Sequence, residues 1–382
     1  LEFRRVLFRS RRNVGLLGTI AYEFGGRRIP ASNTTPDPVR IQGYLREMAD
    51  RYTSACVMEV SSHSLDQERV RGVRFAVAVF TNLTQDHLDY HGTMANYAQA
   101  KARLFAQLEP GTTAVLNLDD PAMAVMADAV PSGVRTLTFG LSPAADVRAE
   151  NLEMSADGTR FTMVLPNGRV ELFLRLCGLH NVQNALAAAA AAVALGVSEL
   201  TIASALEDSR PVPGRLELVE APLGKPSTVR VFVDYAHTPD ALDKALNTLR
   251  QVADVRHGQL WCVFGCGGDR DPGKRAQMGI AARAADHLVI TSDNPRSEEP
   301  SAIIAQILAG TSDMDKDRVQ VIEDRANAIL SAIRHAGKHD VVLVAGKGHE
   351  DYQEIKGRKL VFRDADHAAL ALATRATRYG GH

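Results

Sequence analysis

The chain has 382 residues, which at about 150 residues per domain predicts two or three domains with buried cores. Lysine and arginine total 44 against 45 aspartate and glutamate residues, and a net charge of -1 provides no general attraction to nucleic acid or to an anionic membrane. Apolar residues make up 45% and charged residues 23%, which excludes the disordered, collagen-like and coiled-coil classes.

The first 12 residues, LEFRRVLFRSRR, contain five arginines and one acidic residue, Glu2. A non-native leader, a basic arm and a targeting peptide remain open as interpretations. The non-native leader, taken as residues 1–13, fits best, because transit peptides are usually longer and richer in serine.

The chain shows no sign of a membrane anchor or of secretion. Its longest apolar run, residues 185–195, is much shorter than the roughly 20 residues that cross a bilayer. None of the four cysteines (Cys56, Cys177, Cys262 and Cys266) has a spacing that suggests a disulfide or a metal site. We therefore expect reduced thiols and a cytoplasmic protein.

The region up to residue 213 is predicted to form a central domain around a mixed sheet. Residues 147–176 alternate apolar and polar side chains around Asp157-Gly158 and Asn167-Gly168, which are strong hairpin signals, so part of the sheet is antiparallel. Two helices follow, and the RPVPGR stretch at 210–215 marks a domain boundary. The other predicted elements are strands at 55–60 and 75–83 and helices at 94–108 and 121–129.

Residues 214–382 are predicted to form a doubly wound, Rossmann-like C-terminal domain. Short apolar strands alternate there with helices, as in a parallel sheet that is covered on both faces. Ligands bind at the carboxyl ends of such strands, so the polar residues after each strand are the candidates for a site. The strands are predicted at 229–233, 260–264, 287–291, 319–322 and 341–345, and the helices at 239–252, 275–285, 301–308 and 325–335.

Two loops of the C-terminal domain carry candidate binding residues. In the loop at 265–274, glycines allow close approach of a ligand, and Arg270 and Lys274 add positive charge near a helix N-terminus. After the next strand, Asp293 and Arg296 of the DNPR sequence are able to grip an ammonium and a carboxylate. A flexible turn with solvated charges and a simple strand exit remain the alternatives.

In the central domain, Glu59 stands at the end of the predicted strand at 55–60, and His87 follows the predicted strand at 75–83. Side chains at adjacent strand ends are able to share a hard cation, with oxygen from Glu59 and nitrogen from His87. Capping or hydrogen-bonded structural roles remain open for both residues.

Taken together, the ordered motifs of the chain resemble those of the Mur ligase family, and among its members the type that adds 2,6-diaminopimelate. The resemblance runs from about residue 17 to near residue 361. It rests on SNTT, MEVSSHSLDQERV, VFTNLTQDHLDYHG, YAQAKARLF, GLHNVQNALAA, PVPGRLE, VDYAHTPDAL, WCVFGCGGDRDPGKR, SDNPRSEEP and VLVAGKGHEDYQ.

The resemblance implies an ATP-dependent ligase of peptidoglycan precursor synthesis that forms an amide bond through an acyl phosphate. The implied small-molecule substrates are UDP-MurNAc-L-Ala-D-Glu, meso-diaminopimelate and ATP, with Mg²⁺ as cofactor and no nucleic acid or membrane partner. A monomer is expected. Arg296 agrees with diaminopimelate on independent grounds, because its guanidinium suits the second carboxylate, which lysine lacks.

The resemblance also implies roles for individual residues. Glu59, His87 and a carbamylated Lys101 are the implied catalytic and Mg²⁺-binding residues. Contacts to the muramoyl-dipeptide are implied for Asn33, Thr34, Thr35, Ser61, Gln67 and Arg69. The amino-acid pocket is implied to contain Arg270, Asp293, Asn294, Pro295, Arg296, Gly346 and Glu350, and the nucleotide contacts are Asn181, Asn184, Arg215 and Asp234.

The chain also departs from the family pattern. The family's uridine-nucleotide domain, the first strand of its central domain and its GTNGKT phosphate loop have no counterpart, and no GxxxxGK[ST] sequence occurs in the 382 residues. We therefore expect an exposed apolar sheet edge and little or no ligase activity from this polypeptide. A lysine-adding ligase, a folylpolyglutamate synthase-like ligase and a non-catalytic truncated binding protein remain as alternatives.

Overall fold

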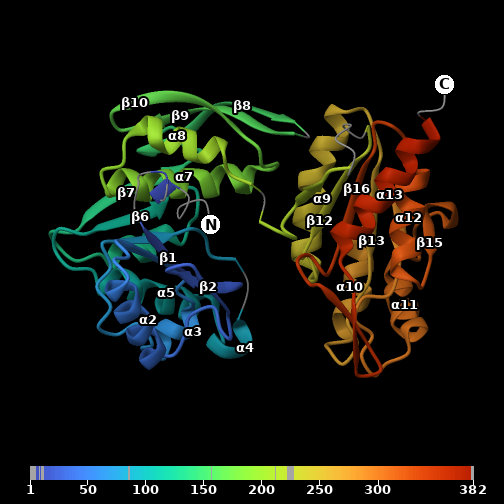
Figure 1. Cartoon of the computed structure of the whole chain (residues 1–382), viewed down its shortest axis with the longest axis horizontal. Coiled ribbons are helices and arrows are strands. Elements are labelled where there is room, and N and C mark those ends of the chain that lie inside the picture. Colours follow the sequence, from blue (N-terminus) through green and yellow to red (C-terminus); the bar gives the residue numbers. More distant parts are fainter. Residues whose placement is uncertain are drawn as a thin grey trace. The chain divides into compact units, whose positions relative to one another are not determined.

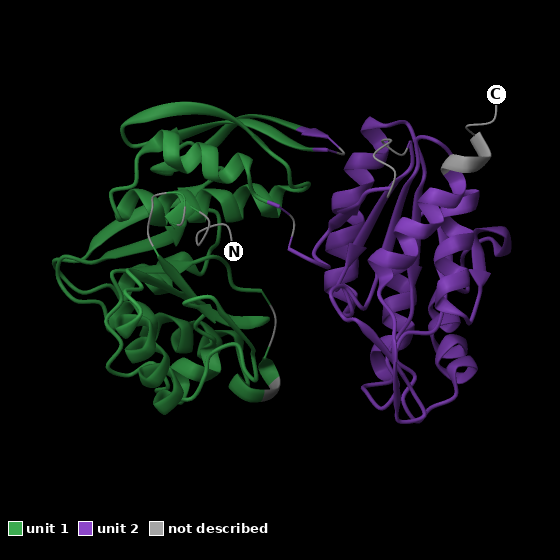
Figure 2. Cartoon of the chain, in the orientation of Figure 1, with its two compact units in different colours: residues 1–153, 158–209 green, residues 154–157, 210–382 purple. Residues whose placement is uncertain are grey.

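The computed structural model describes residues 6–7, 9, 13–84, 87–155, 157–210, 212–221 and 228–379. The chain forms two compact units, residues 1–153 with 158–209 and residues 154–157 with 210–382 (Figure 2). Most of the predicted leader at 1–13 lies outside the described residues, but Val6 and Leu7 are described and buried. No helix in the ranges given above is long and apolar enough to cross a membrane.

Unit 1 begins with a small sheet in the strand order β3-β2-β1-β4. Strand β1 pairs antiparallel with β2 and parallel with β4. Helix α2 starts after Asp37, whose carboxylate accepts a hydrogen bond from the backbone N–H of Arg40, and Pro38 suits its first turn. The elements are β1 (Val14–Leu17), β2 (Ala21–Phe24), β3 (Arg27–Pro30), α2 (Pro38–Asp50), β4 (Ala55–Met58) and α3 (Ser62–Asp66).

The second sheet of unit 1 has the strand order β10-β9-β8-β7-β6-β5. Strands β5 to β8 pair in parallel, whereas β9 and β10 form an antiparallel hairpin, so the expected mixed sheet is confirmed. The turn of that hairpin is formed by residues 166–167, one position earlier than predicted. The strands are β5 (Val77–Phe80), β6 (Thr113–Asn117), β7 (Arg135–Gly140), β8 (Val147–Ser155), β9 (Gly158–Leu165) and β10 (Gly168–Leu174).

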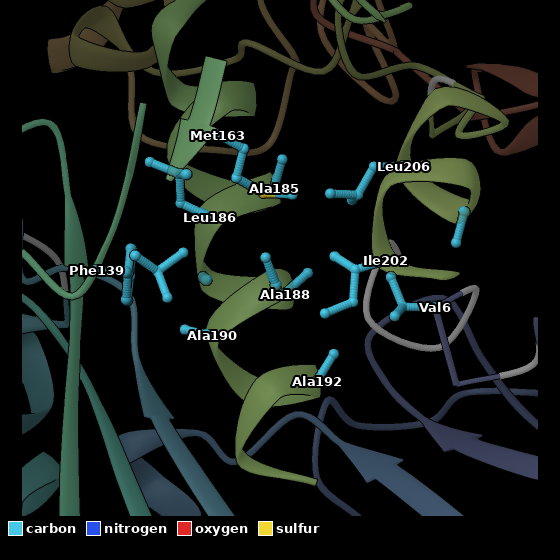
Figure 3. Close-up of a cluster of buried hydrophobic side chains, with 14 of the residues drawn as sticks. Val6, Phe139, Met163, Ala185, Leu186, Ala188, Ala190, Ala192, Ile202 and Leu206 are labelled. Atoms are coloured by element: carbon cyan, nitrogen blue, oxygen red, sulfur yellow. The ribbon is translucent and has the colours of Figure 1, made fainter. Parts of the chain in front are cut away.

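Helix α7 (Leu179–Ala194) forms the centre of the main core of unit 1 (Figure 3). Its alanine run favours helix and lets the backbone lie close to the sheet, where Leu186 packs in the same cluster as Phe139 of β7. Ile202 of α8 (Glu199–Glu207) and Val6 belong to this cluster too. The remaining helices of the unit are α4 (Leu88–His91), α5 (Met94–Ala106) and α6 (Met123–Asp128).

The two sheets of unit 1 each end at an open edge. Strand β4 pairs only with β1, and strand β5 pairs only with β6 among the described residues. An edge of this kind leaves backbone N–H and C=O groups without a strand partner.

Unit 2 contains a six-stranded sheet in the order β11-β12-β16-β13-β14-β15. Strands β12, β16, β13 and β15 are labelled in Figure 1. All neighbouring strands are parallel except β11, which runs antiparallel to β12. A separate hairpin is formed by β17 and β18. The strands are β11 (Glu217–Val219), β12 (Arg230–Asp234), β13 (Leu260–Phe264), β14 (His287–Ile290), β15 (Val319–Val321), β16 (Val341–Ala345), β17 (Tyr352–Ile355) and β18 (Arg358–Val361).

Helices cover the sheet of unit 2. Alternate strand residues such as Val233, Val263 and Val344 pack against α12 and α13, whereas α9 and α11 contact the strands as well. This arrangement confirms the predicted Rossmann-like fold of the C-terminal region. The helices are α9 (Pro239–Val255), α10 (Gly273–Ala282), α11 (Pro300–Leu308), α12 (Arg325–His335) and α13 (Asp364–Tyr379), with short 3₁₀ segments η1 (Ala309–Thr311) and η2 (Lys316–Arg318).

Candidate functional site

A cavity of about 560 Å³ lies between the open edges of β4 and β5 in unit 1. Helices α5 and α7 supply further walls, including Leu104 and Ala188. Five residues selected from the sequence line it, and they come from four separate segments of the chain. These residues are Thr34, Glu59, Ser61, Lys101 and Asn184.

Glu59 directly follows β4, and its side chain is held by a residue that the sequence analysis did not select. Its Oε2 accepts hydrogen bonds from the Thr19 hydroxyl at 2.5 Å and from the Thr19 backbone N–H at 3.2 Å. The hydroxyl of Thr34 lies 3.1 Å from that of Thr19. The carboxylate is therefore fixed at the cavity wall by neutral donors, with its negative charge uncompensated by them.

The SNTT segment is attached to the end of β4 by hydrogen bonds. The buried Thr35 hydroxyl donates to the backbone carbonyl of Glu59 at 2.8 Å and accepts from the backbone N–H of Ser61 at 3.0 Å. Ser61 caps α3, accepting from the Ser64 N–H at 3.2 Å. Asn33 is exposed, and its backbone carbonyl accepts from the Tyr22 hydroxyl.

Gln67 and Arg69 do not line the cavity but lie next to the residues that do. The guanidinium of Arg69 donates to Gln67 Oε1 and to the backbone carbonyl of Thr35, the latter at 3.0 Å. The amide of Gln67 donates to the Tyr90 hydroxyl at 3.3 Å. Arg69 therefore links the end of α3 to the SNTT segment.

Glu59, His87 and Lys101 differ in how well they suit a cation. Glu59 offers an oxygen ligand, and Lys101 shares the same cavity, with its ammonium 5.0 Å from the centre of the Tyr97 ring. An unmodified ammonium is a donor only, so Lys101 fits a metal ion only if it is converted to a carbamate. His87 lies outside the cavity lining, with its ring 4.8 Å from that of His63.

The described residues contain no cluster of three or more His, Cys, Asp or Glu side chains arranged for a metal ion. Mg²⁺ prefers oxygen ligands, and Glu59 supplies one at the cavity wall, while Lys101 would supply another only as a carbamate. Of the two asparagines of α7, Asn184 is exposed and lines the cavity. Asn181 instead donates from its side chain to the carbonyl of Cys177 at 2.8 Å.

In unit 2, the glycine loop after β13 packs directly on the DNPR segment after β14. A Cβ atom on Gly265 would lie 2.3 Å from the carbonyl oxygen of Thr291, and one on Gly268 would lie 2.0 Å from that of Pro295. No side chain fits in these places, so both residues must be glycine. This contact brings the two predicted loops together at the carboxyl ends of the strands.

The side chains of Arg270 and Arg296 both lie close to Gly267. A Cβ on Gly267 would lie 3.0 Å from Nη1 of Arg296 and 3.8 Å from Cγ of Arg270. Arg296 donates from Nη1 to the carbonyl of Gly268 at 2.7 Å, and its Nε lies 3.6 Å from Oε2 of Glu354. Two guanidinium-bearing side chains thus border the loop, which suits a carboxylate ligand.

A second group of polar side chains adjoins the arginines. The amide of Asn294 donates to Oε2 of Glu350 at 2.9 Å, and the fully buried Lys347 donates to both residues. Burial raises the pKa of Asp293, whereas the nearby Arg325 and Lys347 act to lower it. Gly346 has φ +115°, and a Cβ there would lie 2.6 Å from Oδ2 of Asp293.

Asp234 and Arg215 lie at the start of unit 2. Asp234 accepts hydrogen bonds from the backbone N–H groups of Leu216 and Ala236 at 2.7 and 2.8 Å, and its burial raises its pKa. Arg215 lies over the ring of Tyr235, 5.1 Å from its centre. Asp234 thus fixes the local backbone, while Arg215 presents a cation beside an aromatic ring.

Sequence reasoning did not select Thr19, Asn82 or Lys347. Asn82 lines the cavity with Glu59 and stands in the NLTQDH stretch that also contains His87. Lys347 stands between Gly346 and Glu350 in the GKGHE stretch. Asn82 and Lys347 could have been selected from the sequence because Asn82 stands near the end of the predicted strand at 75–83 and Lys347 closely follows the predicted strand at 341–345.

The family profile of the Mur ligase middle domain matches residues 3–192, and that of the Mur ligase glutamate ligase domain matches residues 214–348. A UDP-N-acetylmuramoyl-L-alanyl-D-glutamate--2,6-diaminopimelate ligase of Janthinobacterium sp. (strain Marseille) is 48% identical over 377 residues, covering 95% of this chain and 72% of that protein. A solved structure of a ligase with this name has a TM-score of 0.74 at 36% identity, over 98% of this chain and 75% of that one.

A folylpolyglutamate synthase of Mycobacterium tuberculosis, complexed with ADP and AMPPCP, has a TM-score of 0.68 at 19% identity, covering 100% of this chain and 88% of that one. At this identity the likeness concerns the fold alone. The fold defines an α/β protein of two units, and polar side chains gather at strand ends in each of them. The chain belongs to the Mur ligase family. Mur ligases are ATP-dependent, amide-forming enzymes that use Mg²⁺.

Proposed function

We propose that this protein serves the ATP-dependent addition of meso-diaminopimelate to UDP-MurNAc-L-Ala-D-Glu in peptidoglycan precursor synthesis. The observation that carries the proposal is a group of polar side chains at the strand ends of unit 2, where Arg270 and Arg296 lie close to Gly267 and Asn294 donates to Glu350. Guanidinium groups suit carboxylates, and carboxylate groups suit ammonium ions. A diamino dicarboxylic acid carries both kinds of group at both of its ends.

In the proposed reaction, a carboxylate oxygen of the D-Glu residue attacks the γ-phosphorus of ATP, and ADP leaves as the bridging bond breaks. The amine of diaminopimelate then attacks the acyl carbon and loses a proton, and the bond from that carbon to the bridging oxygen breaks, so that phosphate leaves with this former carboxylate oxygen. Mg²⁺, when bound, neutralises charge on the phosphate oxygens. The residues of unit 2 hold the amino acid so that its amine is oriented for attack.

We assign the cavity of unit 1 to the carboxylate substrate and the cation. Glu59 and Lys101 share its wall, which supports Mg²⁺ binding by Glu59 and a carbamylated Lys101. His87, which lies outside the lining, is assigned to the cation from the resemblance alone. Carbamylation joins CO₂ to the deprotonated lysine amine and converts it to an anionic oxygen donor. The muramoyl-dipeptide is assigned to Asn33, Thr34, Thr35, Ser61, Gln67 and Arg69, and the nucleotide to Asn181, Asn184, Arg215 and Asp234.

The amino-acid pocket is assigned to seven residues after β13, β14 and β16. They are Arg270, Asp293, Asn294, Pro295, Arg296, Gly346 and Glu350. Calorimetric titration of the purified chain with meso-diaminopimelate, lysine and glutamate tests this assignment. We expect diaminopimelate to bind more tightly than either competitor, and preference for glutamate would favour a folylpolyglutamate synthase-like ligase instead.

A second experiment addresses catalysis by this polypeptide. We expect little or no diaminopimelate-dependent phosphate release from the purified 382 residues, because they contain no GxxxxGK[ST] loop to hold the γ-phosphate. Robust turnover would contradict this expectation.

Two further experiments test the oligomeric state and the modification of Lys101. Light scattering on the same sample tests the proposed monomer. Isotope-labelled bicarbonate should give a carbamate carbon signal that the Lys101→Ala variant lacks.

A further inference from the structure

Lys347 is enclosed in the amino-acid pocket of unit 2. Its side chain is 0% exposed, and its ammonium donates to Oδ1 of Asn294 and to Oε2 of Glu350, each at 3.0 Å. It also lies 4.0 Å from Oδ1 of Asp293 and 5.5 Å from the centre of the Tyr352 ring. A group enclosed in this way does not reach a ligand, so its influence on binding must act through its neighbours.

The hydrogen bonds fix which way the amide of Asn294 points. Its Oδ1 accepts from Lys347 and from the backbone N–H of Glu354 at 2.9 Å, so the oxygen has two donors. Its Nδ2 must then face Glu350, to which it donates one of its two hydrogens. Without the ammonium, the amide would lose one of the two donors that hold it in this orientation.

Hydrogen bonds also fix the orientation of the Glu350 carboxylate. Its Oε2 accepts from both Lys347 and Asn294, whereas no hydrogen bond within the described part of the chain reaches its Oε1. The side chain is 21% exposed, so Oε1 is available to a ligand. One amide hydrogen of Asn294 and one carboxylate oxygen of Glu350 are thus left over, a donor beside an anionic acceptor. This pair matches the carboxylate and ammonium of an α-amino acid.

Lys347 also balances charge. Asp293, Glu350 and Asp364 are the acidic groups in this region, and Arg325 is the other buried cation, paired with Asp364. Burial raises the pKa of Asp293, and Lys347 acts against that rise. Further titratable groups that face the cluster are Cys266, Tyr235, His349 and Tyr352. A carboxylate must stay ionised to attract an ammonium, so the buried cation favours ligand binding.

We propose that Lys347 is a positioning residue of the amino-acid pocket, which orients Asn294 and Glu350 so that one amide hydrogen and one carboxylate oxygen face the diamino acid. This inference rests on the proposed function, because it takes diaminopimelate as the ligand. It assigns to the lysine of the GKGHE stretch a role in binding without contact to the ligand.

The test compares diaminopimelate affinity by calorimetry, over a range of pH, in the wild-type chain and in the variants Lys347→Met, Lys347→Gln and Lys244→Met. Glutamine retains N–H donors without the charge, and Lys244 is an exposed lysine of α9, 2.7 Å from Asp240, which serves as the matched control. Circular dichroism checks that each variant is folded.

We expect Lys347→Met to bind about 10- to 100-fold more weakly, because Oδ1 of Asn294 and Oε2 of Glu350 each lose one of their two donors. Lys347→Gln should lose less affinity. Both variants should lose binding at a higher pH than the wild type as the pH falls, because Asp293 has lost a compensating cation. Lys244→Met should behave as the wild type. If Lys347 had only a structural role, its substitution would not shift the pH at which diaminopimelate binding is lost.

A folded Lys347→Met variant with affinity within about twofold of the wild type and an unchanged pH profile would overturn the proposal. Unfolding of both Lys347 variants would also overturn it, because the role would then be structural. A wild-type chain that binds no diaminopimelate would contradict the proposed function itself, and the inference would fall with it.

Discussion

The guanidinium of Arg325 and the carboxylate of Asp364 form a bidentate ion pair in which neither side chain is exposed. Nε to Oδ1 and Nη2 to Oδ2 are both 2.7 Å, and Nη2 also donates to the carbonyl of Ala345 at 2.9 Å. The pair joins the first turns of α12 and α13 to the end of β16, one residue before Gly346. It therefore supports the strand end that carries the amino-acid pocket.

Replacing Arg325 by methionine should lower the free energy of unfolding by about 3–5 kcal/mol, because Asp364 is left buried without a cation. Adding Asp364→Leu should recover much of this loss, since the unpaired charge is removed. Arg46→Met, which breaks an exposed pair with Asp50, is the control and should cost less than about 1 kcal/mol. Urea unfolding measures all three. A loss below about 1 kcal/mol for Arg325→Met would contradict this account.

Gly346→Ala should weaken diaminopimelate binding by at least about tenfold, because the new Cβ would lie 2.6 Å from Oδ2 of Asp293 and displace that carboxylate. Gly357→Ala is the matched control: its φ is +75°, yet no atom lies within 4 Å of the position that a Cβ would take there. Both variants should lose about 1–3 kcal/mol of stability through backbone strain, but only Gly346→Ala should lose affinity. Equal affinities in calorimetry would show that Asp293 tolerates the displacement.

The sequence predicted the elements whose side-chain patterns are strong. The parallel strands of unit 2, such as β13 and β16, consist of fully buried apolar residues, and this pattern was recognised directly. Strands β1 to β3 were not predicted; β3 has no buried apolar run, since three of its four residues are exposed. The hairpin of β17 and β18 also escaped, since every residue of β18 is exposed.

The hairpin of β17 and β18 is held in place by backbone hydrogen bonds. Backbone groups are the same in every residue apart from proline, so these bonds leave no pattern in the amino-acid sequence. The N–H of Arg296 donates to the carbonyl of Glu354 at 3.0 Å, and the N–H of Lys356 donates to the carbonyl of Arg296 at 2.7 Å. For the site, strand ends were a sufficient guide to Arg296 and Glu59. The same guide would also have pointed to Lys347 but not to its role, because that role depends on the hydrogen bond to Asn294, 53 positions away in the chain.

Glu298→Gln should destabilise the protein in a pH-dependent way. The hydrogen bonds from Arg275 lower the pKa of Glu298 from 4.5 to about 2, so its contribution is fully present above pH 4.5 and is lost as the pH falls toward 2. The Tm of the variant should lie below that of the wild type at pH 7, and the gap should narrow below pH 4.5. Glu299→Gln, at an exposed ion pair with Lys356, is the control. A gap that stays constant with pH would show that charge plays no part.

Arg296→Lys tests the basis of amino-acid selection. A lysine ammonium is a single point charge and does not reproduce the two parallel hydrogen bonds of a guanidinium, so diaminopimelate should bind about 10- to 100-fold more weakly. Free lysine lacks the second carboxylate, and its weaker affinity should change much less. The matched control is Arg283→Lys, where the guanidinium binds the carbonyl of Gly310 and the carboxylate of Asp313. Calorimetry with both amino acids gives the ratio of affinities. If Arg296→Lys leaves that ratio unchanged, Arg296 does not select the second carboxylate, and the preference must come from Arg270.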